Sequence, residues 1–253
     1  MLVDIDVIVL AGGEASKVDP AFSGPKSLIE ICGQPMLSYV MDALAGCSDL
    51  REIVVTLPAG VDVTRFAGLA DRFVEGTTDV IDAIEKAIDI LGKDGYILVV
   101  SSDTPLIHSA AIKGFIDKCR QEKAEVYYSI IRRETTEELF PGSHRTYLRL
   151  RDGTFTGGNV HLVAKDAFLR NMKTTKRLFG LRKRPISILS MLGLTFVLRY
   201  FFGRLYVKTL ENKAEDLFDA QVKAIITSYP ELGVDVDKRE DLELVEADRK
   251  SVV

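Results

Sequence analysis

The stretch DIDVIVLAGGEASKVDPAFSGPKSL, residues 4–28, begins as a strand and ends as a loop that carries two lysines. Its first seven residues alternate and then become wholly apolar, which predicts a strand buried in a parallel sheet. Gly12 and Gly13 follow at once. Glycine tolerates positive φ and brings backbone N–H groups close to a ligand, so this order suits a loop that cradles phosphates. Lys17 and Lys26 add compact positive charge, although a tight turn with exposed lysines is the alternative interpretation.

Strand and helix patterns alternate through the first half of the chain. Apolar runs predict further strands, and apolar residues at helical spacing predict helices between them. This alternation predicts a three-layer α/β/α fold around a mostly parallel, Rossmann-like sheet that helices cover on both faces. The expected strands are 4–10, 51–57, 95–103 and 125–131, and the expected helices are 35–47, 80–91 and 109–121.

The alternation of single strands and helices ends near residue 145. RTYLRLRDGTFTGGNVHLVA (145–164) predicts a β-hairpin with an Asp-Gly turn. A basic and very apolar helical stretch follows, then a helix, a strand near KAIITSY and a closing DVDKREDLELVE segment. We therefore expect one domain, 1–253, in which 165–225 is an inserted helical subregion.

The first forty residues carry a recognisable signature. LAGG, then Lys17, then PKSLIEICGQPMLSYVMDAL resembles the opening of the nucleotidyltransferase family with a GT-A-like Rossmann core, which includes molybdopterin-guanine-dinucleotide guanylyltransferases and sugar-phosphate nucleotidylyltransferases. Two positions depart from the pattern: Ala15 replaces a third glycine, and Lys17 stands where the family usually has arginine. The positions in register are Leu10, Gly12, Gly13, Pro25, Lys26, Leu28, Gly33, Pro35 and Met36.

The resemblance implies an NTP transferase that moves an NMP from an NTP to a phosphorylated or hydroxyl acceptor and releases pyrophosphate. Lys17 would hold the β- and γ-phosphates, Lys26 would neutralise charge at the α-phosphate, and Asn159 in TGGNV would contact the acceptor. The nucleotide-binding residues that the resemblance implies are Leu10, Ala11, Gly12, Gly13, Lys17, Lys26, Gly76, Thr77 and Asp103.

A Mg²⁺ site is expected where the strand ILVV ends in SSDTP. Asp103 lies there, at the carboxyl end of a strand that lines the ligand crevice of an open α/β sheet. Its alternative role is to cap a helix. The closing GVDVDKREDLELVE (233–246) resembles the family segment that supplies a second carboxylate, with Asp237 favoured and Asp235 as the rival. Glu240 and Asp241 are expected to begin the last helix.

Three histidines and two arginines are not expected to take part in the site. The histidines, His108, His144 and His161, are assigned no functional role. Arg145 and Arg149 are expected on the solvated side of an antiparallel strand rather than at the acceptor.

Ten basic residues and no acidic one lie between Asp166 and Glu211. Since the net charge of the chain is −4, these leave −14 on the other residues, and a cationic region on an acidic body indicates an anionic partner. The apolar run ISILSMLGLTFVL (186–198) is too short to span a bilayer comfortably. It predicts either a lid or dimer helix packed on the core, or a helix lying on an anionic membrane surface.

The expected partners are an NTP and an anionic small-molecule acceptor. Peripheral contact with an anionic membrane or a lipid phosphate, and a homodimer, are the alternatives for 165–210. Nucleic acid is not expected, because no recognisable binding module is present. An odd number of cysteines and acidic residues near the N-terminus predict a cytoplasmic protein, peripheral at the inner membrane surface if it contacts lipid.

Two other functions fit parts of the sequence. One is a GT-A glycosyltransferase that uses an NDP-sugar, against which stand the absence of a D-x-D motif after ILVV and the presence of Lys26. The other is a non-catalytic nucleotide-binding or membrane-surface protein, which Ala15 and Lys17 favour.

Overall fold

The first predicted strand, β1 (Ile5–Leu10), lies inside an eight-stranded sheet, between β4 (Leu50–Leu57) and β6 (Tyr96–Ser101), both parallel to it. The computed structural model of the protein describes residues 2, 4–66, 68, 70–76, 79–181, 196, 199–200 and 202–251. The strands follow the order β10, β7, β9, β6, β1, β4, β5, with β8 paired to β9. The other strands are β5 (Arg72–Glu75), β7 (Val126–Arg132), β8 (Leu148–Leu150), β9 (Gly153–Ala164) and β10 (Val222–Thr227), and a separate pair is formed by β2 (Glu30–Ile31) and β3 (Gln34–Pro35).

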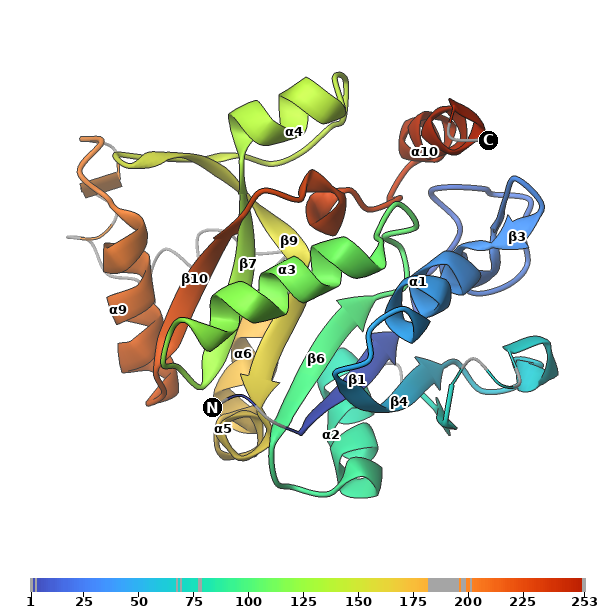
Figure 1. Cartoon of the computed structure of the whole chain (residues 1–253), viewed down its shortest axis with the longest axis horizontal. Coiled ribbons are helices and arrows are strands. Elements are labelled where there is room, and N and C mark those ends of the chain that lie inside the picture. Colours follow the sequence, from blue (N-terminus) through green and yellow to red (C-terminus); the bar gives the residue numbers. More distant parts are fainter. Residues whose placement is uncertain are drawn as a thin grey trace.

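Helices cover both faces of the sheet, as the alternating pattern predicts. Figure 1 shows α1 and α3 in front of the strands and α2, α5 and α6 behind them. Alternate residues of β1 bury Val7 and Val9 under α1 and α3, and Ile8 under α2. The helices are α1 (Met36–Ala45), α2 (Val80–Leu91), α3 (Ser109–Arg120), α4 (Arg133–Leu139), α5 (Lys165–Arg170), α6 (Met172–Leu181), α9 (Val207–Phe218) and α10 (Arg239–Ser251), with short 3₁₀ turns at Lys26–Leu28, Val63–Phe66 and Pro230–Gly233.

The predicted α/β fold with a mostly parallel, Rossmann-like sheet is confirmed, with one feature that the local patterns did not place. The long strand β9 lies between β6 and β7 and runs antiparallel to both. The hairpin signal explains its direction, because β8 and β9 must pair antiparallel across the Asp-Gly turn. Its insertion in the middle of the sheet depends on long-range pairing, which no hairpin pattern encodes.

The basic region after β9 returns the chain to the sheet. The helices α5 and α6 follow β9, and β10 pairs in parallel with β7 at the edge of the sheet. The expected helix at 186–198 lies outside the described residues, apart from Phe196. Within the part of the chain that the structure describes, the helices are too short or too polar to cross a membrane.

A buried ion pair lies beneath the amino end of β1, far from the Gly-Gly loop along the strand. Lys165, at the start of α5, and Asp6, in β1, each expose 1% of their side chain, and Nζ lies 2.6 Å from Oδ2. The carbonyl oxygen of Leu91 accepts a longer bond from the same ammonium, at 3.4 Å, and the Glu52 amide donates to Asp6 Oδ1 at 3.3 Å. These contacts join β1, β4, α2 and α5, so the pair has a structural role.

The start of α2 provides a test of helix capping. The side chain of Asp79 accepts hydrogen bonds from the amides of Ile81 at 2.8 Å and Asp82 at 3.2 Å. Asp79→Ala is expected to lower the free energy of unfolding by about 0.5–2 kcal/mol, because it leaves these amides without their acceptor. Urea denaturation measures the change, and Asp89→Ala, at an exposed position of the same helix, serves as the control and should stay within about 0.5 kcal/mol of the parent protein.

Candidate functional site

The loop after β1 is closed by its own backbone. The Lys26 amide donates to the Gly13 carbonyl at 2.8 Å, Glu14 forms a bridge with Pro25, and Ser27 Oγ donates to the Ala11 carbonyl at 3.0 Å. These bonds return the chain to the end of β1 after the excursion through residues 14–24. Lys26 is thereby held beside the Gly-Gly pair, at the carboxyl edge of the sheet where an α/β fold binds its ligands.

The two glycines are explained by space rather than by backbone conformation, because neither has a positive φ. A Cβ atom on Gly13 would lie 3.3 Å from Cε of Lys26, which is tighter than ordinary contact. A Cβ on Gly12 would meet nothing within 4 Å, so this position leaves open space at the surface of the loop. Glycine was expected here for its backbone freedom. The structure indicates instead that glycine at position 13 allows the Lys26 side chain to lie close to the loop backbone.

Ala15, at the position of the third glycine in the family pattern, is part of a small apolar cluster. It exposes 4% of its surface and packs with Val18, Ile29 and Met36, and with Val236 from the closing segment. The amides of Val18 and Asp19 both donate to its carbonyl, at 2.8 and 2.9 Å. The loop therefore has an apolar anchor under its middle, and the exposed Lys17 rises between the two anchoring residues.

Lys26 connects the loop to two carboxylates from distant parts of the chain. Its Nζ lies 2.5 Å from Asp103 Oδ2 and 2.8 Å from Asp237 Oδ1, and only 8% of the residue is exposed. Burial lowers the pKa of Lys26, but the two carboxylates outweigh this effect and raise it above its ordinary value. Ser101 Oγ donates to the other Asp103 oxygen at 2.5 Å. The ammonium is therefore held charged at the end of β6.

Asp235 and Asp237 both reach this point, and their backbone explains how. The Val236 amide donates to the Asp103 carbonyl at 2.9 Å, which fastens the closing segment to the end of β6. Ligand atoms of the three aspartates lie within 4.8 Å of one another, and no other such group of three exists among the described residues. Burial raises the pKa of Asp237, but Lys26, Arg145 and Lys17 outweigh it and hold the pKa below its usual range. Oxygen ligands of this kind suit Mg²⁺.

Arg145 corrects one expectation from the sequence. It was expected on the solvated side of the hairpin, whereas its side chain is 14% exposed and forms an ion pair with Asp235. Burial lowers the pKa of the guanidinium, and the carboxylates of Asp241, Asp237 and Asp103 oppose that effect. Its Nε is buried without a hydrogen-bond partner among the described residues, so it offers a donor to an anion at this edge. Arg149 is exposed, as predicted.

Two helix ends settle the alternatives for Asp103 and Asp241. No helix begins at Asp103, since α3 starts at Ser109 after His108, whose Nδ1 accepts from the Ala111 amide at 3.3 Å. Asp241 lies in the first turn of α10, as predicted, and its Oδ2 accepts from the amides of Asp237 and Lys238 at 3.0 and 2.9 Å. The capping role proposed for Asp103 is therefore wrong, and Asp241 holds the backbone of Asp237.

Asn159 lies at the same edge of the sheet. It precedes Val160, the partner of Val100 near the end of β6, and its Nδ2 is buried without a hydrogen-bond partner in the described structure. Position 158 has room only for glycine, because a Cβ atom there would lie 2.2 Å from Ser129 Oγ. Of the predicted contacts in the α2 loop, Gly76 lies against the Leu57 backbone, and Thr77 lies outside the described residues.

His161 was assigned no functional role, and its burial predicts that the stability of the fold depends on pH. Burial lowers its pKa to about 4, and it stacks on Tyr128 at 4.4 Å between ring centroids. Since the unfolded chain binds this proton near pH 6.5, the neutral ring stabilises the fold above that pH, and the contribution is lost as pH falls toward 4. Relative to His161→Gln, the parent protein is expected to lose up to about 3 kcal/mol between pH 6.5 and 4. Urea denaturation across this range measures it, and His144→Gln, exposed, should leave the profile unchanged.

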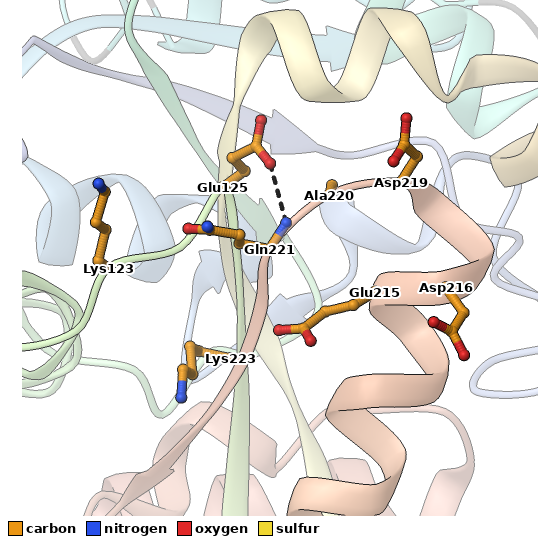
Figure 2. A pocket seen from close by; sticks show the side chains of 8 residues that line it. All are labelled: Lys123, Glu125, Glu215, Asp216, Asp219, Ala220, Gln221 and Lys223. Carbon is orange, nitrogen blue, oxygen red and sulfur yellow. Dashed lines mark hydrogen bonds between the residues drawn. The ribbon is translucent and has the colours of Figure 1, made fainter.

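A second hollow lies at the opposite edge of the sheet, near the amino ends of β7 and β10. It has a volume of about 850 Å³. Figure 2 shows that its charged side chains point in different directions and do not converge on one point. Glu125 is already engaged, since its Oε2 accepts from the Gln221 amide at 2.9 Å. This hollow gathers no ligand set comparable to that around Lys26.

Comparison with known sequences adds an independent result. Residues 7–174 match the family described as the MobA-like NTP transferase domain. Bifunctional protein GlmU from Polaromonas sp. (strain JS666 / ATCC BAA-500) is 29% identical over 133 residues, which are 47% of this chain and 27% of that protein. GlmU from Nitrosomonas eutropha is 30% identical over 125 residues, 48% of this chain and 27% of that protein. The chain thus spans about a quarter of the length of these curated relatives.

Solved structures extend the similarity over nearly all of the chain. A hypothetical transferase from Thermus thermophilus is 32% identical, has a TM-score of 0.84 and covers 95% of this chain and 100% of its own. A CMP:2-keto-3-deoxy-manno-octonic acid synthetase complexed with CTP has a TM-score of 0.64 at 13% identity and covers 99% of this chain and 100% of its own. The second likeness concerns the fold alone.

Proposed function

We propose a reaction for this chain, which belongs to the MobA-like NTP transferase family and is a nucleotidyltransferase. It moves an NMP from an NTP to a phosphorylated small-molecule acceptor and releases pyrophosphate. The reaction depends on Mg²⁺. The observation that carries the proposal is the position of Lys26, held charged against Asp103 and Asp237 at the end of the Gly-Gly loop. This arrangement brings a cation and metal-type ligands to the place where a triphosphate would lie.

The loop residues would bind the triphosphate. Open space at Gly12 leaves room for phosphate oxygens beside the backbone of Ala11 and Gly13. Lys17, exposed on the same loop and close enough to lower the pKa of Asp237, would contact the β- and γ-phosphates. Leu10, Gly76 and Thr77 would contact the rest of the nucleotide.

The donor set fits a magnesium ion. Asp103 and Asp237 would hold it, with Asp235 kept nearby by Arg145, since Mg²⁺ takes oxygen ligands and is usually bound by one or two carboxylates together with phosphates. Bound there, Mg²⁺ supplies positive charge that neutralises phosphate oxygens. Lys26 now lies between the two carboxylates, so we expect its ammonium to turn toward the α-phosphate when the substrates bind.

The reaction needs positioning and charge neutralisation more than proton transfer. An oxygen of the acceptor phosphate attacks the α-phosphorus, and the bond from that phosphorus to the bridging oxygen of pyrophosphate breaks. A phosphate acceptor is nucleophilic without a general base, while Lys26 neutralises charge that grows on the α-phosphate oxygens. The unpartnered donors Arg145 Nε and Asn159 Nδ2 favour an anionic acceptor at this edge.

Pyrophosphate release tests the proposal. The protein is assayed with each of the four NTPs and Mg²⁺ against phosphorylated sugars, phosphorylated polyols and lipid phosphates, beside Asp103→Asn. Release that needs one NTP and one acceptor, and that falls by about 10²-fold or more in the variant, is the expected result. NTPs that raise the melting temperature without any turnover would instead favour a nucleotide-binding protein, and the absence of any NTP effect on melting would refute the phosphate loop.

A further inference from the structure

A large groove lies on the face of the sheet away from α1 and α3. It has a volume of about 820 Å³, within the range of ligand pockets. Its lining residues come from the strands β1, β6, β7, β8, β9 and β10 and from the helices α2, α5, α6 and α9. Figure 1 shows where these elements lie, with α9 and α2 on different sides of the strands β7 and β9. The lining is almost wholly apolar, and its side chains include Val99, Val163, Phe168, Phe179, Leu210 and Phe218.

The floor of the groove is long, and Tyr128 exposes part of it to solvent. Val126, Tyr128 and Ile130 alternate along one face of β7, which gives the floor a length of about 13 Å at the rise of a β-strand. Tyr128 exposes 43% of its surface there, whereas its neighbour Tyr127, on the other face, exposes 1%. The stacked His161 adds no charge at neutral pH, because burial lowers its pKa to about 4. A concave lining that is mostly apolar, with few polar groups, is typical of a small-molecule pocket.

One end of the groove adjoins the nucleotide site. Leu10, which lines this end, is the last residue of β1 before the Gly-Gly loop. Thr156 and Gly157 line it as well, and they precede Asn159 by a few residues in β9. A chain lying in the groove would therefore present its head near Asn159, at the edge of the sheet that carries Lys26.

Cations and exposed aromatic side chains lie beside the groove wall. Leu205 is buried against Leu150 and Phe155, which line the groove, and so anchors the described residues 202–206 there, with 199 and 200 before them in the chain. Among these residues Arg199 and Arg204 are exposed, as is Phe202, which is 71% exposed. Within the described structure neither arginine forms an ion pair with a carboxylate. Cations interleaved with exposed aromatic residues favour an anionic lipid surface.

We propose that the groove binds the hydrocarbon chain of a single-chain lipid monophosphate, whose phosphate is the acceptor of the NMP. This rests on the proposed function. An oxygen of the lipid phosphate attacks the α-phosphorus of the NTP, the bond to the bridging oxygen breaks, and pyrophosphate leaves with that electron pair. The product is a lipid joined to the nucleoside through a diphosphate. The apolar floor of the groove matches the hydrocarbon chain of such a molecule. The cationic border and the position beside the nucleotide site match its phosphate.

Chain-length dependence on the parent protein tests the inference without any substitution. Dodecyl phosphate, kept below its micelle concentration, and butyl phosphate are titrated into the full chain by calorimetry. Burial of each methylene strengthens binding up to about fourfold, so we expect dodecyl phosphate to bind at least about 100-fold more tightly. Dodecyltrimethylammonium, with the opposite head charge, should bind more weakly than dodecyl phosphate. Equal dissociation constants for the two alkyl phosphates would overturn the inference.

Filling the groove gives the matched test. Ala214→Phe in α9 and Ala224→Phe in β10 both project a ring into it, whereas Ala110→Phe, exposed on α3, places the same ring on the opposite face. We expect the first two to weaken dodecyl phosphate binding at least 10-fold and to leave binding of butyl phosphate and NTP unchanged. Unchanged dodecyl phosphate binding in both would overturn the groove. So would a dimer of the parent protein that Ala214→Phe dissociates, since a second copy would then be the occupant.

Turnover separates this inference from the proposed function. Pyrophosphate release that is faster with dodecyl than with butyl phosphate supports both. Equal rates with the two acceptors overturn the lipid acceptor and leave the nucleotidyl transfer standing. If no NTP raises the melting temperature while dodecyl phosphate still binds, the proposed function and the acceptor role both fail, and only the lipid-binding groove is supported.

Discussion

Lys26→Ala is expected to lower the kcat of pyrophosphate release by about 10²- to 10³-fold, the size of effect seen when one group that stabilises transition-state charge is removed. The ammonium lies 2.5 Å from Asp103 and 2.8 Å from Asp237, so its loss also leaves two carboxylates facing each other at the metal-type site. We therefore expect Mg²⁺ to bind the variant more tightly in the absence of nucleotide, because the competing cation is gone. Steady-state kinetics and Mg²⁺ titration measure the two effects.

Two controls isolate the role of this lysine. Lys113→Ala removes an exposed lysine from α3 and should leave kcat unchanged. Lys26→Arg keeps the charge but loses the compact ammonium, so it should recover only part of the activity. A Lys26→Ala variant with the kcat and the Mg²⁺ affinity of the parent protein would contradict the charge-neutralising role of Lys26.

Lys165→Met is expected to lower the free energy of unfolding by about 3 kcal/mol, because it removes the closest partner of the charged and buried Asp6. The loss lies at the lower end of the range for a broken buried pair, since the half-exposed Arg51 keeps its Nε 3.6 Å from the other carboxylate oxygen. Both side chains are 1% exposed, and the pair lies at the amino end of β1, away from the nucleotide site. The KM for NTP should therefore change little in the fraction of protein that remains folded. Equilibrium urea denaturation gives the free energy, and steady-state kinetics give the KM.

The double variant Asp6→Leu/Lys165→Met distinguishes the destabilisation caused by the unpaired buried charge from that caused by lost contacts of the two side chains. Replacing both charges by apolar side chains of similar volume is expected to restore most of the stability, since no uncompensated charge stays buried. A double variant as unstable as Lys165→Met would show instead that the hydrogen bonds to Leu91 and Glu52 carry the contribution.

The first strand and the Gly-Gly loop illustrate what a local pattern predicts well. A run of apolar residues, two glycines and a helix at Met36 depend on neighbours a few positions away, and the structure has β1, the loop and α1 within one or two residues of the expected bounds. The same holds for α2, which ends at Gly92 with a positive φ, as a glycine after a helix predicts.

The position of β9 illustrates the opposite case. Its hairpin with β8 was predicted, but its place between β6 and β7 depends on pairing with strands that lie far away in sequence. Arg145 was misplaced for a related reason. The alternation of the hairpin indicates a solvated side, whereas the carboxylate that buries Arg145 comes from Asp235, 90 positions along the chain.

The sequence by itself determined the fold class, the loop, and the aspartates and lysines to examine, because these rest on short periodicities and on a resemblance carried by neighbouring residues. Only the tertiary structure decided which of them meet. Lys26 contacts Asp103 and Asp237 across 77 and 211 positions, and the apolar groove exists because α6 and α9 stand apart over β7 and β9. Such contacts form when strands and helices pack, and no local pattern records them.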